Sequence, residues 1–147
     1  MPPPTQEPLG LQLSRVARQL QRAFDDALAE VGGSLPTWVV LATLKGLQHA
    51  MQRDLAVRAG IEPATMTHHL NRLEAAGFVV RTRSPENRRI QTVALTADGE
   101  ALFARLVRAV IAFDSRLRQG LDEAETDAFR TTLDRLSANV AAITAAT

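Results

Sequence analysis

The segment from residue 63 to residue 76 combines apolar side chains at helical spacing with small and hydrogen-bonding side chains. Met66, Leu70 and Leu73 are four and three residues apart, so they fall on one face of a helix. The opposite face carries few of the acids that a phosphate would repel. Such a face suits contact with base edges, because the major groove of duplex DNA admits one helix. The candidate DNA-contact residues on it are Ala64, Thr65, Thr67, His68, Asn71 and Arg72.

The charge of the chain is unevenly distributed. Residues 52–91 contain seven Arg and four acidic residues, a net charge of +3, although the whole chain carries only +1. A basic middle segment suggests contact with a polyanion. The chain uses Arg for nearly all of its basic residues, however, and such a bias can come from genome composition. An ordinary solvated surface therefore remains the alternative interpretation.

Three histidines, His49, His68 and His69, raise the question of a metal site. Zinc needs three or four ligands that converge from different directions, and neighbouring helical residues diverge by roughly 100°. The chain has no Cys, which excludes disulfides, thiol sensing and thiolate ligands. No nucleophile triad or glycine-rich phosphate loop stands at a credible spacing. We expect no metal, no cofactor and no enzymatic activity.

The elements that must position this helix are mainly helical as well. Apolar residues recur at three- and four-residue steps over residues 13–31, and two glycines follow. Ser34 or Thr37 can cap a second helix. A short third helix is predicted over 53–59, just before the helix at 63–76. Two short helices joined by a tight turn form a helix-turn-helix.

A hairpin is predicted next. Residues 78–83 and 90–95 are β-prone, and the six residues between them are all polar. This hairpin would be a wing with an exposed basic tip beside the helix-turn-helix. Its candidate DNA-contact residues are Arg83, Arg88 and Arg89.

Two long helices should end the chain. Thr96 can cap the first, and the run that starts at Asp122 is a capping-box pattern for the second. Apolar residues of the last helix alternate steps of four and three, which is typical of packing on other helices. An intrachain bundle would explain this seam, but long first and last helices around a small middle unit favour a dimer. The predicted dimerisation residues are Leu13, Phe129, Leu133, Leu136, Val140 and Ile143.

The fold class that follows is mainly α with a small two-stranded β-wing, a winged helix-turn-helix plus a helical dimerisation region. We expect a flexible Pro-rich arm at 1–8, an N-terminal dimerisation helix at 9–33, a winged DNA-binding unit at 34–97 and C-terminal dimerisation helices at 98–147. The start of the chain lacks the pattern of a signal peptide, and the longest strongly apolar stretch, 38–42, is too short to cross a bilayer. These features predict a cytoplasmic location.

Five motifs follow one another in the order and spacing of MarR-type transcription regulators, which this sequence resembles over about residues 9–143. They are Asp54-Leu55-Ala56, Thr65-Met66-Thr67, Leu73-Glu74-Ala75-Ala76-Gly77-Phe78-Val79, Arg88-Arg89 and Leu95-Thr96-Ala97-Asp98-Gly99. The resemblance implies a homodimer whose winged lobes bind a pseudopalindromic operator in double-stranded DNA. It also implies a regulator, most often a repressor, whose DNA affinity falls when a small and often aromatic molecule binds.

The wing departs from the family pattern at one position. The family usually has an Asp two residues before its wing Arg, whereas Asn87 precedes Arg88 and Arg89 here. Asn carries no charge that could pair with an Arg, so we expect a less rigid wing. Arg89 should still reach the minor groove or its phosphates, while Arg81, Arg83 and Arg88 are expected to contact the DNA backbone or support the wing.

Two questions stay open from the sequence. The resemblance implies a ligand cleft between the dimer helices and each lobe, and Arg15, Trp38, His49 and Arg108 are conceivable contributors. A core role for Trp38 and surface roles for the two Arg residues are the favoured interpretations, so the ligand-binding residues are unassigned. The alternative function is a winged-helix dimer that binds ligands or proteins without sequence-specific DNA binding.

Overall fold

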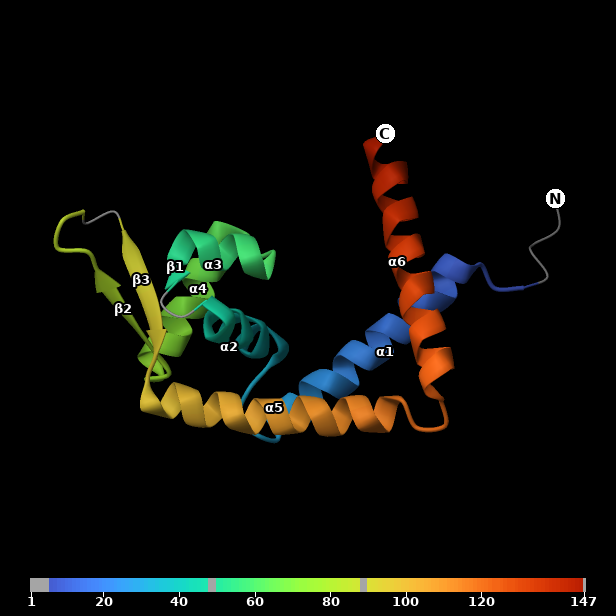
Figure 1. Ribbon diagram of the computed structural model, residues 1–147, viewed down its shortest axis with the longest axis horizontal. Helices are drawn as coiled ribbons and strands as arrows, with labels where there is room; N and C mark the ends of the chain where they lie inside the picture. Colours follow the sequence, from blue (N-terminus) through green and yellow to red (C-terminus); the bar gives the residue numbers. More distant parts are fainter. Residues whose placement is uncertain (1–5, 48–49, 88–89, 147) are drawn as a thin grey trace. The chain divides into compact units, whose positions relative to one another are not determined.

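The computed structural model describes residues 6–47, 50–87 and 90–146 (Figure 1). Its helices and strands in chain order are α1 Leu9–Ala29, α2 Leu35–Leu47, β1 Ala50–Met51, α3 Gln52–Ala59, α4 Pro63–Ala75, β2 Val79–Arg83, β3 Gln91–Leu95, α5 Ala97–Leu117 and α6 Glu123–Ala145. The chain divides into two compact units, one ending at Ile111 and the other beginning at Ala112. This mainly helical architecture with a small antiparallel sheet confirms the predicted fold class.

The sheet has three strands in the order β1-β3-β2, all antiparallel to their neighbours. Strands β2 and β3 form the predicted hairpin, paired from Val79 with Leu95 to Arg83 with Gln91. The sequence-based prediction of two strands missed β1, where Ala50 pairs with Val93. A strand of two residues is too short to show a periodic pattern, and its partner is distant in sequence.

Local capping sets where three helices begin. The Ser34 hydroxyl accepts a hydrogen bond from the Thr37 amide at 3.3 Å, and the Thr96 hydroxyl accepts one from the Gly99 amide at 3.1 Å. Asp122 accepts from the Glu125 amide at 2.8 Å, and the Glu125 carboxylate accepts from the Asp122 amide at 2.9 Å. These contacts satisfy amides that a helix start leaves unpaired, as the sequence predicts.

One core holds the first unit together. Its fully buried side chains come from helices α1 to α5 and from the central strand of the sheet. Trp38 and Phe103 pack against this core as a stacked pair with ring centroids 5.8 Å apart. The fully buried residues are Leu28, Val40, Leu41, Leu55, Met66, Leu70, Val93, Leu102 and Leu106.

Gly99 stands where α5 passes close to the chain before the wing. A Cβ atom at this position would overlap the Phe78 carbonyl oxygen, which is backbone and cannot rotate away. We therefore expect Gly99→Ala to lower the free energy of unfolding by about 1–3 kcal/mol, as other overpacked sites do.

Gly46 in α2 is a matched control for that substitution. A Cβ atom there would meet nothing within 4 Å, so Gly46→Ala should leave stability unchanged or raise it by up to about 1 kcal/mol. Urea unfolding of both variants checks the pair of expectations. Equal effects at the two glycines would contradict the close approach at Gly99.

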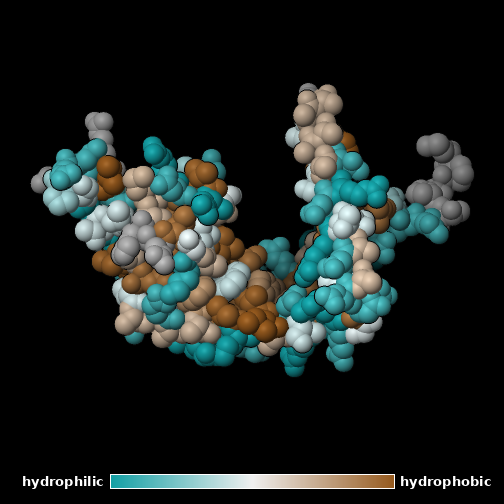
Figure 2. Space-filling model, viewed as in Figure 1, coloured by the Kyte–Doolittle hydropathy of each residue, from teal (hydrophilic) through white to brown (hydrophobic). Residues whose placement is uncertain are grey.

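The second unit consists of the end of α5, the turn at Gly120 and helix α6. None of the α6 residues is buried, although several of them are large and apolar. Figure 2 shows such side chains reaching the surface of this helix. No helix in the described part of the chain is long and apolar enough to cross a membrane.

Candidate nucleic-acid interface

Helices α3 and α4 are joined by a tight turn that the sequence favours. Gly60 ends α3 in the left-handed conformation at φ 64°, which glycine adopts without steric cost. Pro63 occupies the first turn of α4, where its missing N–H is not needed. Met66, Leu70 and Leu73 are buried, which confirms the predicted inner face. The apolar face thus anchors α4 and determines which side chains it presents outward.

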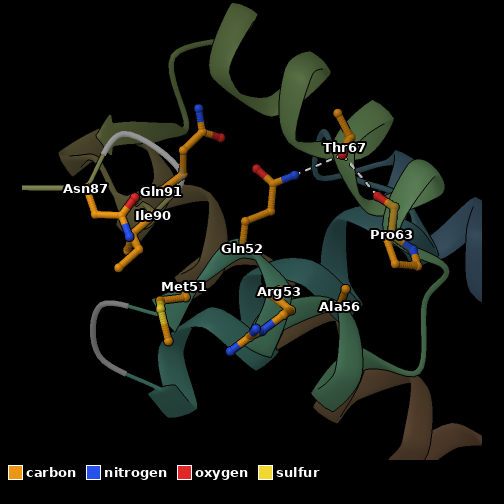
Figure 3. A pocket seen from close by; sticks show the side chains of 9 residues that line it. All are labelled: Met51, Gln52, Arg53, Ala56, Pro63, Thr67, Asn87, Ile90 and Gln91. Carbon is orange, nitrogen blue, oxygen red and sulfur yellow. Dashed lines mark hydrogen bonds between the residues drawn. The ribbon is translucent and has the colours of Figure 1, made fainter. Parts of the chain in front are cut away.

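Most of the predicted contact residues of α4 are exposed. Thr67 differs, because it is half-buried and its hydroxyl donates to the Pro63 carbonyl at 3.0 Å while accepting from Gln52 Nε2 at 2.8 Å (Figure 3). The hydroxyl thereby uses its only proton and one of its two lone pairs within the protein. The exposed strip of α4 consists of Ala64, Thr65, His68, Asn71 and Arg72.

Gln52, which the sequence reasoning did not single out, lies beside a cleft of about 740 Å³. The cleft lies against α3, the start of α4 and the wing, and the side chains of Gln52 and Gln91 both project toward it in Figure 3. Gln52 Oε1 is buried and has no hydrogen-bond partner among the described residues. Because Thr67 donates its only proton to Pro63, it holds the Gln52 amide in this orientation.

A second polar cluster connects α4 to strand β2. Arg81 donates to Glu74 Oε2 from Nε at 3.1 Å and from Nη2 at 2.6 Å, and its backbone amide donates to Glu74 Oε1 at 3.2 Å. Arg81 Nη2 also donates to Asn71 Oδ1 at 2.6 Å. The Arg81 side chain is only 17% exposed. This position supports the prediction that Arg81 acts as a wing support.

The Arg81–Glu74 contact should make stability depend on pH. Hydrogen bonds from the Arg81 side chain lower the pKa of the Glu74 carboxyl below its ordinary value. A carboxyl with a lowered folded-state pKa stabilises the fold above its unfolded-state pKa, and this stabilisation is lost as the pH falls through the folded-state pKa.

We therefore expect Glu74→Gln to destabilise the protein at neutral pH and to have little effect in acid. The check is urea unfolding of wild type and variant at a series of pH values from about 7 downward, in which the destabilisation of the variant should shrink as the pH falls below the ordinary range of a carboxyl. A difference in unfolding free energy that stays constant with pH would contradict the proposed origin of the pKa shift.

The two adjacent histidines of α4 have different surroundings. His68 is exposed, whereas His69 is half-buried, and this burial, aided by His68 and Arg72, lowers the His69 pKa. Their rings are tilted, with centroids 6.0 Å apart.

Within the described ranges, no three His, Asp or Glu side chains are grouped so that they could hold a metal ion. His49 lies outside the described residues.

Only one of the three predicted basic contact residues of the wing lies in the described part of the chain. Arg83 is exposed at the end of β2, whereas Arg88 and Arg89 lie outside the described residues. The Ser84 hydroxyl accepts hydrogen bonds from the amides of Glu86 and Asn87, both at 3.3 Å. These bonds shape the described side of the tip.

The predicted dimerisation residues differ in exposure. Phe129, Val140 and Ile143 are 56%, 61% and 68% exposed. The remaining three, Leu13, Leu133 and Leu136, are half-buried. Large apolar groups along one helix that stay exposed in a single chain usually mark an interaction site.

Two of the four conceivable ligand contacts, Arg15 and Trp38, have structural explanations. Arg15 pairs with Glu7 at 2.9 Å, and Trp38 is packed on the core by its stacking with Phe103. Nothing in the described side chains assigns a role to Arg108. Ligand-binding residues therefore stay unassigned.

The MarR family model matches residues 34–91, which run from the start of α2 through the helix-turn-helix to the first residue of β3. The HTH-type transcriptional repressor Rv2887 of Mycobacterium tuberculosis is 33% identical over 132 residues, covering 90% of this chain and 95% of the relative. The HTH-type transcriptional regulator PecS of Dickeya dadantii is 32% identical over 127 residues, covering 84% of this chain and 76% of the relative.

Two solved structures share the fold over nearly the whole chain. The transcriptional repressor CouR, bound to a 23-mer DNA duplex, is 30% identical with a TM-score of 0.80, covering 88% of this chain and 92% of that one. BpsR of Bordetella bronchiseptica, whose DNA binding is regulated by 6-hydroxynicotinic acid, is 26% identical with a TM-score of 0.80, covering 93% of this chain and 98% of that one.

Proposed function

Because the chain belongs to the MarR family of transcription regulators, we propose that it binds an inverted repeat in duplex DNA as a homodimer and represses transcription until a small molecule binds. The protein is a regulator and not an enzyme. In the proposed complex α4 of each protomer enters a major groove, and the two half-sites are centred about 10 bp apart.

The observation that carries this proposal is the exposed strip of α4. Its inner face is fixed by three buried side chains, and its outer face offers hydroxyl, imidazole, amide and guanidinium groups. These groups can pair with base edges or phosphates. Arg83 lies on the adjacent wing, where it can add contacts to the DNA backbone.

The exposed apolar seam of α6 supports the dimer. Phe129, Val140 and Ile143 are spaced along one helix and are more than half exposed. A second copy that packs against this seam would remove these groups from water, which is the main favourable term in association. A symmetric dimer also matches the symmetry of an inverted repeat.

A small-molecule effector is part of the proposal. BpsR, which is 26% identical to this chain, is regulated by an aromatic acid, so an effector of similar size and aromatic character is the first class to test. Such a ligand lowers DNA affinity only by the difference between its affinities for the DNA-competent and the DNA-incompetent conformation. The proposal also places the protein in the cytoplasm, since a bacterial-type repressor must reach chromosomal DNA.

Selection of bound duplexes from a random library by the purified full-length protein tests the function. We expect an inverted repeat with half-sites about one helical turn apart, and an affinity that falls steeply with salt. If the folded protein enriches no sequence and binds weakly at all salt concentrations, the proposal fails. A winged-helix dimer that binds other ligands or proteins would then be the better interpretation.

A further inference from the structure

We propose that Arg81 is a positioning residue that orients the Asn71 amide, so that Asn71 presents a hydrogen-bond donor to the DNA. This inference rests on the proposed DNA binding and concerns which bases the exposed strip of α4 selects. The juxtaposition that carries it is the hydrogen bond from Arg81 Nη2 to Asn71 Oδ1 at 2.6 Å.

The Arg81 side chain is held firmly enough to act in this way. Two of its N–H groups contact the Glu74 carboxylate, and its own backbone amide contacts the same carboxylate. Charge-assisted bonds of this kind are the stronger ones in proteins. With Glu74 on α4 and Arg81 on β2, the guanidinium occupies a fixed place beside Asn71.

A guanidinium contains only donors, so it discriminates between the two ends of an amide. If the Asn71 amide were reversed, its NH2 group would face the donors of Arg81. The observed orientation engages Oδ1 with Arg81 and leaves Nδ2 as the hydrogen-bonding group for a partner outside the protein. Asn71 is exposed and lies three residues after His68 on the outer strip of α4.

This orientation has a consequence for base preference. An Asn that uses both ends of its amide pairs with adenine, accepting from N6 and donating to N7. Arg81 takes one lone pair of the Asn71 oxygen and leaves both Nδ2 protons unused by that contact, so Asn71 favours base edges that present acceptors, such as guanine N7 and O6 or thymine O4. Arg81 would thus influence a base that it does not itself touch.

The test is the random-duplex selection repeated with Arg81→Met, which keeps an unbranched apolar stem and removes the donors. We expect one position, repeated symmetrically in the two half-sites, to shift toward adenine by about 5- to 150-fold, the value of a bidentate contact. Circular dichroism and thermal melting establish that the variant is folded.

Asn71→Asp tests the same inference without removing Arg81. One carboxylate oxygen can keep the contact with the guanidinium, while the other replaces the donor by an acceptor. The same position should then shift toward cytosine, whose N4 group is a donor. This variant decides the question even if Arg81→Met does not fold.

Arg83→Met is the matched control, because it removes a positive charge from the same strand and Arg83 is exposed. It should weaken binding about equally for all sequences and leave the base preferences unchanged. If Arg81→Met and Asn71→Asp lower affinity without changing any base preference, Arg81 has only a structural role and the inference is overturned, while the proposed function stands. If wild type enriches no duplex, both fail.

Discussion

Phe129→Asp is expected to separate the homodimer into folded monomers. The side chain is 56% exposed in the single chain and belongs to the apolar seam of α6. In the dimer it would be covered, and an aspartate there would have to leave water without a partner. Loss of an aromatic anchor from an interface typically costs 2 kcal/mol or more, so the dimer dissociation constant should rise by at least about 30-fold.

The affinity for operator DNA should fall as the dimer dissociates, because a monomer can occupy only one half-site. The fold of the monomer should survive, since none of the α6 residues is buried and the capping box at Asp122 fixes the start of the helix locally. Sedimentation equilibrium measures the oligomeric state, and circular dichroism at the same concentrations measures the helix content. The duplex-binding assay then relates affinity to the dimer fraction.

Ala138→Asp is the matched control for this variant. Ala138 is exposed on the same helix, two residues from both Leu136 and Val140, and so lies away from the seam. The added charge is the same, but it should remain in water and leave the dimer intact. If Phe129→Asp stays as dimeric as Ala138→Asp, the seam does not form the interface and another surface of the chain must do so.

The sequence predicts those parts of the fold whose causes are local. Ser34, Thr96 and Asp122 cap helices through amides three residues away, so a short stretch of sequence contains the whole signal. The buried face of α4 follows from helical spacing alone. Strand β1 escaped prediction because Ala50 pairs with Val93, and no local pattern encodes such a distant partner.

In the candidate site, too, contacts between distant parts of the chain could not be predicted from local sequence. Thr67 lies at the flank of the helix, about 90° from the apolar face, so spacing does not decide whether it points outward or toward a neighbour. Its contact with Gln52, fifteen residues earlier in the chain, decides the matter. The Glu74–Arg81 pair is seven residues apart across a turn, and only the packing of β2 beside α4 brings the two charges together.

Leu70→Ala is expected to lower the free energy of unfolding by about 2–5 kcal/mol, the range found for buried leucines that leave a cavity. Leu70 is fully buried at the centre of the inner face of α4. Domains of this size have only about 5–15 kcal/mol of stability, so the loss should be conspicuous in a urea or thermal unfolding curve. The fraction that remains folded keeps the outer strip of α4 intact.

His68→Ala, two positions earlier on the same helix, should have the opposite effects. The imidazole is exposed, so its removal should change the unfolding free energy by less than about 0.5 kcal/mol. Its loss should instead weaken duplex binding or relax the preference at one base. Leu70→Ala, measured at a temperature where it is folded, should retain the wild-type base preference. If both variants altered stability and base preference alike, α4 would not have the separate anchoring and reading faces on which the proposed recognition depends.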